Sequence, residues 1–375
     1  MIGAAVLLSY SAAAVLLVLG GLVAYARAYF RSLRPNRAGL ARDLRWLEKA
    51  LPLEDYREAE FDNGDVVEYY EQTTFRDYRL LELATWCDAM HTELAPKTRL
   101  PYRPGQLQQL LYVIAHAGSA KTVLEVGSGK GSNSVFLAAL LPHVRFFAVD
   151  LVPAHVRVAS RAAREAGLRN VAFFLGDACA PPEPLAALEF DLVFGIESLC
   201  HMDTPEKMSD FLGPAGPRLS AGGRLVIVDG FRSGRFEELG ADVREAMNLA
   251  ESGFRIRRMP SKADWSALAA RRGLRLVQAT DLTPEALAFW TRGWKAARVL
   301  TLCPGLVRWY LGGGGERSKE RSGERSGERS GEQGREQKGA RQRRETGANF
   351  VAVMMTAYAM ALGSAEYGVL AFVKD

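Results

Sequence analysis

Three alternating glycines give the clearest chemical signal in the sequence. The apolar run 122–126 leads directly into Gly127-Ser128-Gly129-Lys130-Gly131, and residues 133–141 then favour a helix. A glycine turn between a strand and a helix lets backbone N–H groups approach a ligand where a side chain would collide. The pattern predicts a nucleotide-binding loop that includes Gly127, Ser128, Gly129 and Gly131.

Acidic residues stand at the points where such a ligand would need acceptors. Glu125 lies two residues before the first glycine, and Asp150 ends the next apolar run, 144–149. A carboxylate at that place is suited to accept two hydrogen bonds from a ribose diol. The dinucleotide fingerprint is excluded because Ser132 stands where its third glycine would fall. Gly131 after Lys130 likewise breaks the P-loop pattern.

The remaining pattern, an acid two residues before three alternating glycines, resembles the class I S-adenosylmethionine-dependent methyltransferases. The resemblance implies S-adenosylmethionine as cofactor, with Asp150 at its ribose. Asp177, after the run 171–175, would then accept from the adenine amino group, although a helix N-cap is the structural alternative. The further cofactor contacts expected from the resemblance are Glu125, Leu151, Ala178 and Ile196.

Short apolar strands alternate with helices from residue 105 onward, which is typical of a parallel α/β sheet. Five strands are expected up to residue 229, and residues 274–280 and 366–374 supply a sixth and a seventh. The predicted fold is therefore the seven-stranded, Rossmann-like sheet of the class I methyltransferases, flanked by helices. It covers 105–311 and 346–375.

Glu197 and His201 follow the fourth strand and are the expected catalytic residues, because the acceptor should lie at this edge of the sheet. The stretch 196–202, Ile-Glu-Ser-Leu-Cys-His-Met, resembles the corresponding loop of the sterol C-24 and tocopherol C-methyltransferases. Both residues have structural alternatives, as a partner of backbone donors and as a packing residue. No metal site is expected, because the Asp, Glu and His residues lack a ligand spacing such as HxxxH.

A helical segment over 27–104 is expected to form a lid over the acceptor. It also resembles the sterol and tocopherol group, and Tyr69, Tyr70 and His91 are its candidate acceptor contacts. The tyrosines could instead be core aromatics. One departure is Thr92-Glu93 after Met90-His91, where the group usually has a second histidine or an aromatic residue. The contacts of this lid with the acceptor are therefore expected to differ from those of the group.

Residues 1–26 carry no charged side chain, and a helix formed by this segment would be long enough to cross a membrane. Arginines follow at positions 27, 31, 34 and 37, so the positive-inside rule predicts a single-pass anchor with the catalytic domain on the cytoplasmic, or stromal, side. A cleaved signal peptide and a buried core helix are the alternatives. The anchor suggests a small, lipophilic acceptor: a sterol, a prenyl quinone or chromanol, or a lipid headgroup.

Residues 312–345 repeat the tetrad Glu-Arg-Ser-Gly and contain no aromatic or large aliphatic residue. Such a segment buries no core, so we expect a disordered insert within the domain. RNA or anionic lipid would be conceivable partners, but the alternating charges favour a solvated linker.

The composition excludes other classes. The chain has 375 residues, 48% of them hydrophobic, a net charge of +5 and four widely spaced cysteines, so neither a fibrous chain nor a disulfide framework is indicated. A nucleic-acid methyltransferase would need Asn/Asp-Pro-Pro-aromatic after the fourth strand, where this chain reads Gly195-Ile196-Glu197-Ser198. A catalytically silent subunit that scaffolds a membrane complex remains the alternative to an enzyme.

Overall fold

The computed structural model describes residues 28–29, 32–57, 61–74, 90–94, 105–301 and 329–375. The chain divides into two units, Met1–Pro35 and Asn36–Asp375, and the second unit holds the whole sheet. Among the described residues, no helix combines the length and the apolar character needed to cross a membrane. The predicted anchor, 1–26, lies outside the described residues and stays a prediction.

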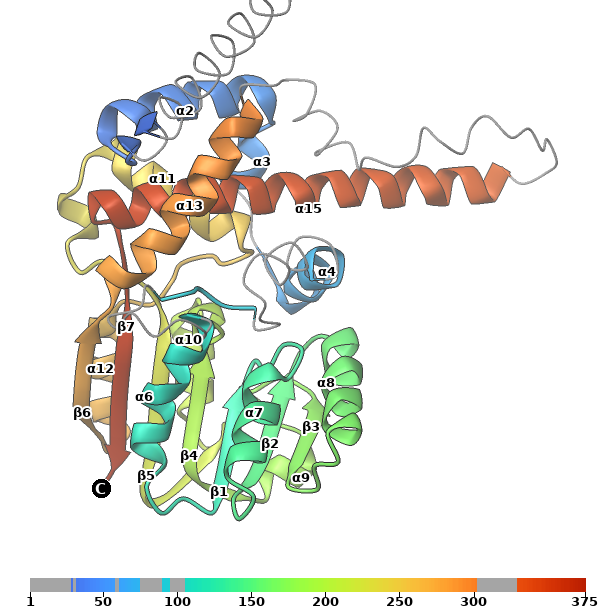
Figure 1. Cartoon of the computed structure of the whole chain (residues 1–375), viewed down its shortest axis with the longest axis vertical. Coiled ribbons are helices and arrows are strands. Elements are labelled where there is room, and N and C mark those ends of the chain that lie inside the picture. Colours follow the sequence, from blue (N-terminus) through green and yellow to red (C-terminus); the bar gives the residue numbers. More distant parts are fainter. Residues whose placement is uncertain (1–27, 30–31, 58–60, 75–89, 95–104, 302–328) are drawn as a thin grey trace, which may run out of the picture. The chain divides into compact units, whose positions relative to one another are not determined.

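The core of the second unit is a seven-stranded sheet with the order β3-β2-β1-β4-β5-β7-β6 (Figure 1). Strands β1 to β5 are parallel, whereas β7 is antiparallel to both β5 and β6. The strands are β1 Thr122–Val126, β2 Arg145–Asp150, β3 Val171–Leu175, β4 Glu189–Ile196, β5 Arg218–Arg232, β6 Leu274–Asp281 and β7 Ala365–Lys374. The predicted seven-stranded, Rossmann-like sheet with flanking helices is confirmed, and the glycine loop follows β1.

Helices connect the strands, as parallel pairing requires. Those within the sheet region are α6 Gln108–Ala117, α7 Ser132–Leu140, α8 Pro153–Glu165, α9 Glu183–Ala186, α10 Pro205–Phe211 and α12 Lys262–Arg271, with 3-10 turns at Gly105–Leu107, Leu199–His201 and Phe236–Glu238. The remaining helices are α2 Arg37–Ala50, α3 Glu54–Arg57, α4 Asn63–Thr73, α11 Ala241–Gly253, α13 Thr283–Thr301 and α15 Arg329–Leu362. The last group lies beyond the carboxyl ends of the parallel strands (Figure 1).

Buried apolar side chains cover both faces of the sheet and form its core. The pairing register brings the ends of the central strands to one level: Val126 lies opposite both Val149 of β2 and Gly195 of β4. The loops that follow β1, β2 and β4 therefore meet at a single edge. That edge is the usual ligand-binding position of an open α/β sheet.

Asp43 joins the helices that cover this edge. Its buried carboxylate accepts hydrogen bonds from Tyr358 of α15 at 2.6 Å and from Arg298 of α13 at 3.1 Å. Asp43 lies on α2, so one carboxylate links three helices. As expected for an amphipathic α2, Leu40 and Leu47 are buried.

The expectation of disorder over 312–345 is corrected for its second half, because α15 begins at Arg329. Glu, Gln, Arg, Lys and Ala residues have favourable helix propensity. The apolar residues after 346 pack against α11 and α13, and an anchored helix extends backward at little further cost. Residues 312–328 lie outside the described part of the chain.

Candidate active site

Two neighbouring cavities lie at the carboxyl edge of the sheet. The first contains the glycine loop and the ends of β2 and β3, and the second lies between the sheet edge and helices α11, α13 and α15. The cavities share five lining residues: Tyr70, Met90, His91, Glu197 and His201. We call these five residues the junction. A ligand in one cavity would meet a ligand in the other there.

The glycine loop forms the floor of the first cavity. Gly129 has a φ of +53°, and a Cβ atom added to it would meet only Met90 Sδ, at 3.4 Å. This glycine therefore presents bare backbone to the cavity, which fits the close approach of a ligand. Gly127 and Gly131 have positive φ as well, but their added Cβ atoms would strike Ser198 at 2.3 Å and Ala159 at 2.5 Å. Gly131 serves packing against α8 and does not line the cavity.

Asp150 lines the first cavity and also fixes the loop. Its Oδ2 atom accepts from the N–H of Gly129 at 2.7 Å, and Oδ1 accepts from the N–H of Val152 at 2.8 Å. His155 lies 3.2 Å from Oδ1. Each carboxylate oxygen has two lone pairs, so acceptor capacity remains for a ribose. Leu151, Ala178 and Ile196 line this cavity too, as predicted.

Glu125 does not line the cavity and lies behind the glycine loop. Its carboxyl group accepts from Asn133 at 3.0 Å and from the hydroxyl of Ser134, both on α7. Complete burial raises the pKa of Glu125 to about 7. Asn133 also contacts His91 Nε2 at 3.2 Å, so the expected cofactor contact is a support for the loop and for the junction.

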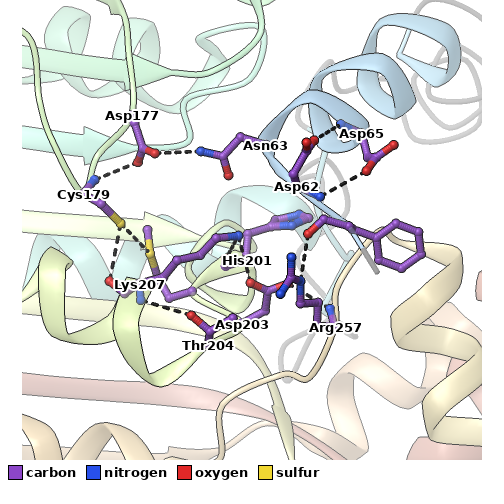
Figure 2. A network of polar contacts seen from close by, with 12 residues as sticks. Asp62, Asn63, Asp65, Asp177, Cys179, His201, Asp203, Thr204, Lys207 and Arg257 are labelled. Atoms are coloured by element: carbon purple, nitrogen blue, oxygen red, sulfur yellow. Dashed lines mark hydrogen bonds and ion pairs between the residues drawn. The ribbon is translucent and has the colours of Figure 1, made fainter. Parts of the chain in front are cut away.

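Asp177 faces α4, which the sequence did not connect with it (Figure 2). Its Oδ2 atom accepts from Asn63 at 2.7 Å, and Oδ1 accepts from the N–H of Cys179 at 2.8 Å. The second contact is a turn and not the N-cap of a helix. Both Asn63 and Asp177 line the first cavity, and the adenine role of Asp177 stays a prediction.

The start of α4 is held from the side of the sheet domain. Asp62 and Asp65 form a capping box at this helix end (Figure 2). Arg257 Nε donates to the carbonyl of Phe61 at 2.8 Å, and Arg257 N donates to Asp203 at 2.8 Å. These contacts place Tyr70, near the end of the same helix, at the junction.

Only one of the two predicted lid tyrosines reaches the cavities. Tyr70 OH lies 3.2 Å from His201 Nε2, and its ring packs edge-on against the imidazole. Tyr69, the preceding residue on the helix, lines neither cavity: it is fully buried, and its hydroxyl donates at 3.1 Å to Asn349 of α15, which lines the second cavity. The expectation that Tyr69 contacts the acceptor is therefore corrected, since adjacent helical residues do not share a face.

The ring of His201 is largely enclosed, and this desolvation lowers its pKa to about 4. The imidazole is therefore neutral at pH 7. Its Nδ1 atom is buried and has no partner among the described residues. Cys200, beside it, is a buried thiol whose pKa is raised well above its usual value, so it is not a reactive thiolate.

Glu197 has a left-handed backbone with φ of +50°, an uncommon conformation for this residue type. Its Oε1 atom accepts from the N–H of Thr92 at 2.8 Å and from the hydroxyl of Tyr367 at 2.7 Å. Oε2 accepts no hydrogen bond from the described residues, and the side chain lines both cavities. Strained residues of this kind concentrate at functional sites.

Asp229, at the second cavity, was not among the predicted site residues. Its carboxyl group accepts from the N–H groups of Ser198, Cys200 and Gly230, at 2.8–3.1 Å. Burial, reinforced by the charge of Glu197, raises the pKa of Asp229 to about 7. Its position at the end of a buried strand was the available sequence signal. The described residues contain no cluster that would hold a metal ion.

One segment of the chain matches the model of a known family. Residues 123–223 match the model of the methyltransferase domain family. A stretch of 125 residues is 36% identical to erythromycin 3''-O-methyltransferase from Saccharopolyspora erythraea, over 33% of this chain and 39% of that protein. Another of 150 residues is 31% identical to protein-L-isoaspartate O-methyltransferase from Pseudomonas fluorescens, over 40% and 63%. The chain thus spans less than two thirds of the length of these relatives.

Solved structures share the fold. Geranyl diphosphate C-methyltransferase from Streptomyces coelicolor has a TM-score of 0.55 at 17% identity, with 84% of this chain and 97% of that chain covered. The cyclopropane synthase MmaA2 from Mycobacterium tuberculosis has a TM-score of 0.57 at 15% identity, with 84% and 100% covered. The family match over residues 123–223, together with the strand order, indicates a methyltransferase domain with the class I fold, and S-adenosylmethionine is its cofactor.

Proposed function

We propose that this protein transfers a methyl group from S-adenosylmethionine to a small, lipophilic acceptor. The supporting observation is the junction: the cavity of the glycine loop and the cavity beneath α11, α13 and α15 share Tyr70, Met90, His91, Glu197 and His201. Methyl transfer is an in-line displacement, which needs donor and acceptor held in contact and shielded from water. Two cavities that meet at one wall provide that arrangement.

The character of the second cavity indicates the acceptor class. It has a volume of about 480 Å³, within the range of about 300–1,000 Å³ that is typical of small-molecule sites. Its lining is mostly apolar and includes Met247, Phe254, Ile256, Phe289, Trp290, Val353 and Met360. Polar groups line the cavity at the junction and at Asp229, and also at Glu93, Arg292, Asn349, Thr356 and Glu366. An acceptor with an apolar body and a polar reactive end at the junction fits this lining.

In this proposal the first cavity holds the cofactor, with Gly127, Ser128 and Gly129 beneath it and Asp150 and Asp177 as acceptors. When bound, S-adenosylmethionine supplies a methyl group already activated by its sulfonium. Glu197 directs Oε2 toward the acceptor and takes up its proton, while neutral His201 holds Tyr70 in place. The surrounding apolar side chains exclude water.

The narrower resemblance to the sterol C-24 and tocopherol C-methyltransferases supports an acceptor such as a sterol, a prenyl quinone or chromanol, or a lipid headgroup. Three of the solved structures of this fold are described as bound to geranyl diphosphate or its thiolo analogue, which are isoprenoid in character. Residues 1–26 would anchor the protein in a membrane, with the catalytic domain on the cytoplasmic or stromal side. Tethering would keep the domain close to acceptors dissolved in the bilayer.

The alternative is a catalytically silent subunit that scaffolds a membrane complex. One solved structure with this fold, at a TM-score of 0.54, is described as a [4+2]-cyclase, so the fold by itself does not determine the reaction. We expect the purified full-length chain, incubated with methyl-labelled cofactor and a total lipid extract, to label a discrete lipid. Glu197→Gln serves as the matched control and should bind the cofactor but label little. Cofactor binding without any labelled product would support the silent subunit.

A further inference from the structure

Glu197 is held by groups from two distant parts of the chain. Thr92, whose N–H donates to Oε1, belongs to the described segment 90–94, and Tyr367, whose hydroxyl donates to the same oxygen, belongs to β7. Both bonds end on Oε1, so Oε2 keeps its acceptor capacity, and the side chain lines both cavities. The backbone of Glu197 is fixed as well, because its N–H donates to the carbonyl of Val228 at 2.9 Å.

Tyr367 is itself fixed by Gln109. The amide Nε2 of Gln109 on α6 lies 2.6 Å from the hydroxyl oxygen of Tyr367, and both side chains are buried. An amide nitrogen only donates, so the hydroxyl accepts from Gln109 and must direct its own proton to Glu197. If the amide were reversed, Gln109 Oε1 would lie against the hydroxyl of Tyr367. The single hydroxyl proton would then have two acceptors, Gln109 Oε1 and Glu197 Oε1, and one of them would lose its hydrogen bond. Hydrogen bonds are therefore donated in one direction, from Gln109 to Tyr367 and from Tyr367 to Glu197.

From this geometry we infer that Tyr367 is a positioning residue for Glu197. The inference rests on the proposed function: Tyr367 also lines the second cavity, but its hydroxyl is engaged by Gln109 and Glu197, so it acts by fixing the rotamer of Glu197 and by holding Oε1 against the N–H of Thr92. The segment with His91 and Thr92 is thereby tied to β7 through one carboxylate. Burial and the charge of Glu197 raise the pKa of Tyr367 well above its usual value, so the hydroxyl remains a donor across the physiological range.

The first test measures the positioning directly and needs no turnover. In Tyr367→Phe, loss of the hydroxyl should free Glu197 and speed hydrogen exchange of the Thr92 amide by about tenfold. Tyr358→Phe is the matched control, because Tyr358 is equally buried, donates to the carboxylate of Asp43 at 2.6 Å and lines neither cavity. Unchanged Thr92 exchange in Tyr367→Phe, or equal acceleration in both variants, would overturn the inference.

The second test uses a double-mutant cycle on methyl transfer. Tyr367→Phe should lower kcat by about tenfold with little change in cofactor affinity, and it should have no further effect in the Glu197→Gln background, because the tyrosine acts only through the carboxylate. Independent, multiplying effects would show that Tyr367 does not act through Glu197. If the wild-type protein transfers no methyl group, the proposed function fails, while the exchange experiment still decides whether Tyr367 positions Glu197.

Discussion

Glu345 forms a bidentate ion pair with Arg255, ninety residues earlier in the chain. Its carboxylate accepts from Nε at 3.0 Å and from Nη2 at 2.7 Å, and both side chains are buried. Arg255 also lies over the ring of Phe61, 5.1 Å from the ring centre. The pair thus joins α15, the loop after α11 and the residues before α4, three parts of the chain that lie next to the second cavity.

We expect Glu345→Gln to lower the free energy of unfolding by about 3–5 kcal/mol, because it leaves the guanidinium of Arg255 buried without a counter-charge. Glu237→Gln is the matched control: its ion pair with Arg244 is 3.5 Å long and exposed. Removal of such a surface pair changes stability by less than about 1 kcal/mol. Urea denaturation of both variants provides the comparison, and equal losses would contradict the structural role of the buried pair.

The same pair divides the low-complexity segment into parts with different consequences. Deletion of residues 312–328 with a short Gly/Ser bridge should leave the melting temperature and cofactor affinity unchanged, because loop length has little effect on closure entropy. A deletion extended through Glu345 removes the partner of Arg255 and should lower the melting temperature strongly. A large loss from the shorter deletion would show that the Glu-Arg-Ser-Gly repeat packs against the domain.

Gly129→Val should abolish cofactor binding in a folded protein, because the added side chain would enter the first cavity, where only Met90 Sδ lies near its Cβ. The left-handed backbone adds about 1–2 kcal/mol of strain. Gly167→Val controls for this strain, since Gly167 has φ of +69° with no atom within 4 Å of an added Cβ. Calorimetry should find normal affinity in the Gly167 variant. Near-normal affinity in Gly129→Val would remove this glycine from the cofactor site.

The sheet and the glycine loop could be predicted from the sequence because their signals are local. Most strands contain a short apolar run; the glycines and Asp177 come soon after such runs, and Asp150 ends one. The partners of Glu197 and Asp177 could not be predicted in this way. Tyr367 lies 170 residues from Glu197, and Asn63 lies 114 residues from Asp177. No local pattern shows which distant side chains the fold brings to one edge.

Helix α4 shows a different limit. Tyr69 and Tyr70 are the same residue type in adjacent positions, and only the tertiary packing of the helix decides which of them faces the cavities. The first part of α15 carries two opposed signals. Its low-complexity sequence predicts disorder, whereas its charged residues favour a helix once the apolar part is anchored. Glu125 was placed at the right turn but on the wrong side of it, because the sequence does not show that α7 supplies its partners.

Glu125→Gln should change the pH dependence of stability. Burial raises the pKa of Glu125 from 4.5 to about 7, so the folded state binds more protons than the unfolded state between these values. The contribution of this group is therefore present below pH 4.5 and is lost as the pH rises to 7. Glutamine does not titrate, so its contribution to stability does not change with pH. As the pH rises from below 4.5 to above 7, the free energy of unfolding of the variant should increase by up to about 3 kcal/mol relative to that of the wild type. Denaturation curves at several pH values measure the difference, and a constant difference would mean that Glu125 titrates normally.

The final prediction concerns residues 1–26, whose freedom from charge motivates the proposed anchor. Their removal should release a protein that still binds S-adenosylmethionine, because the glycine loop and its supports lie beyond residue 120. Turnover on a detergent-dispersed lipid acceptor should survive the truncation. Turnover on the same acceptor in bilayers should fall sharply, since tethering supplies a high effective concentration at the surface.

A matched control separates anchoring from simple damage to the fold. Replacing residues 1–26 by an unrelated apolar helix of the same length should restore activity on bilayers, because any tether would supply the same effective concentration. A replacement helix of the same length that contains several serines is less hydrophobic and should not restore activity on bilayers. If the truncated protein works equally well on bilayers, the proposed role of the anchor is wrong. If it prefers a water-soluble acceptor, the lipophilic acceptor is wrong. In both cases the cofactor site and the junction of the two cavities would stand.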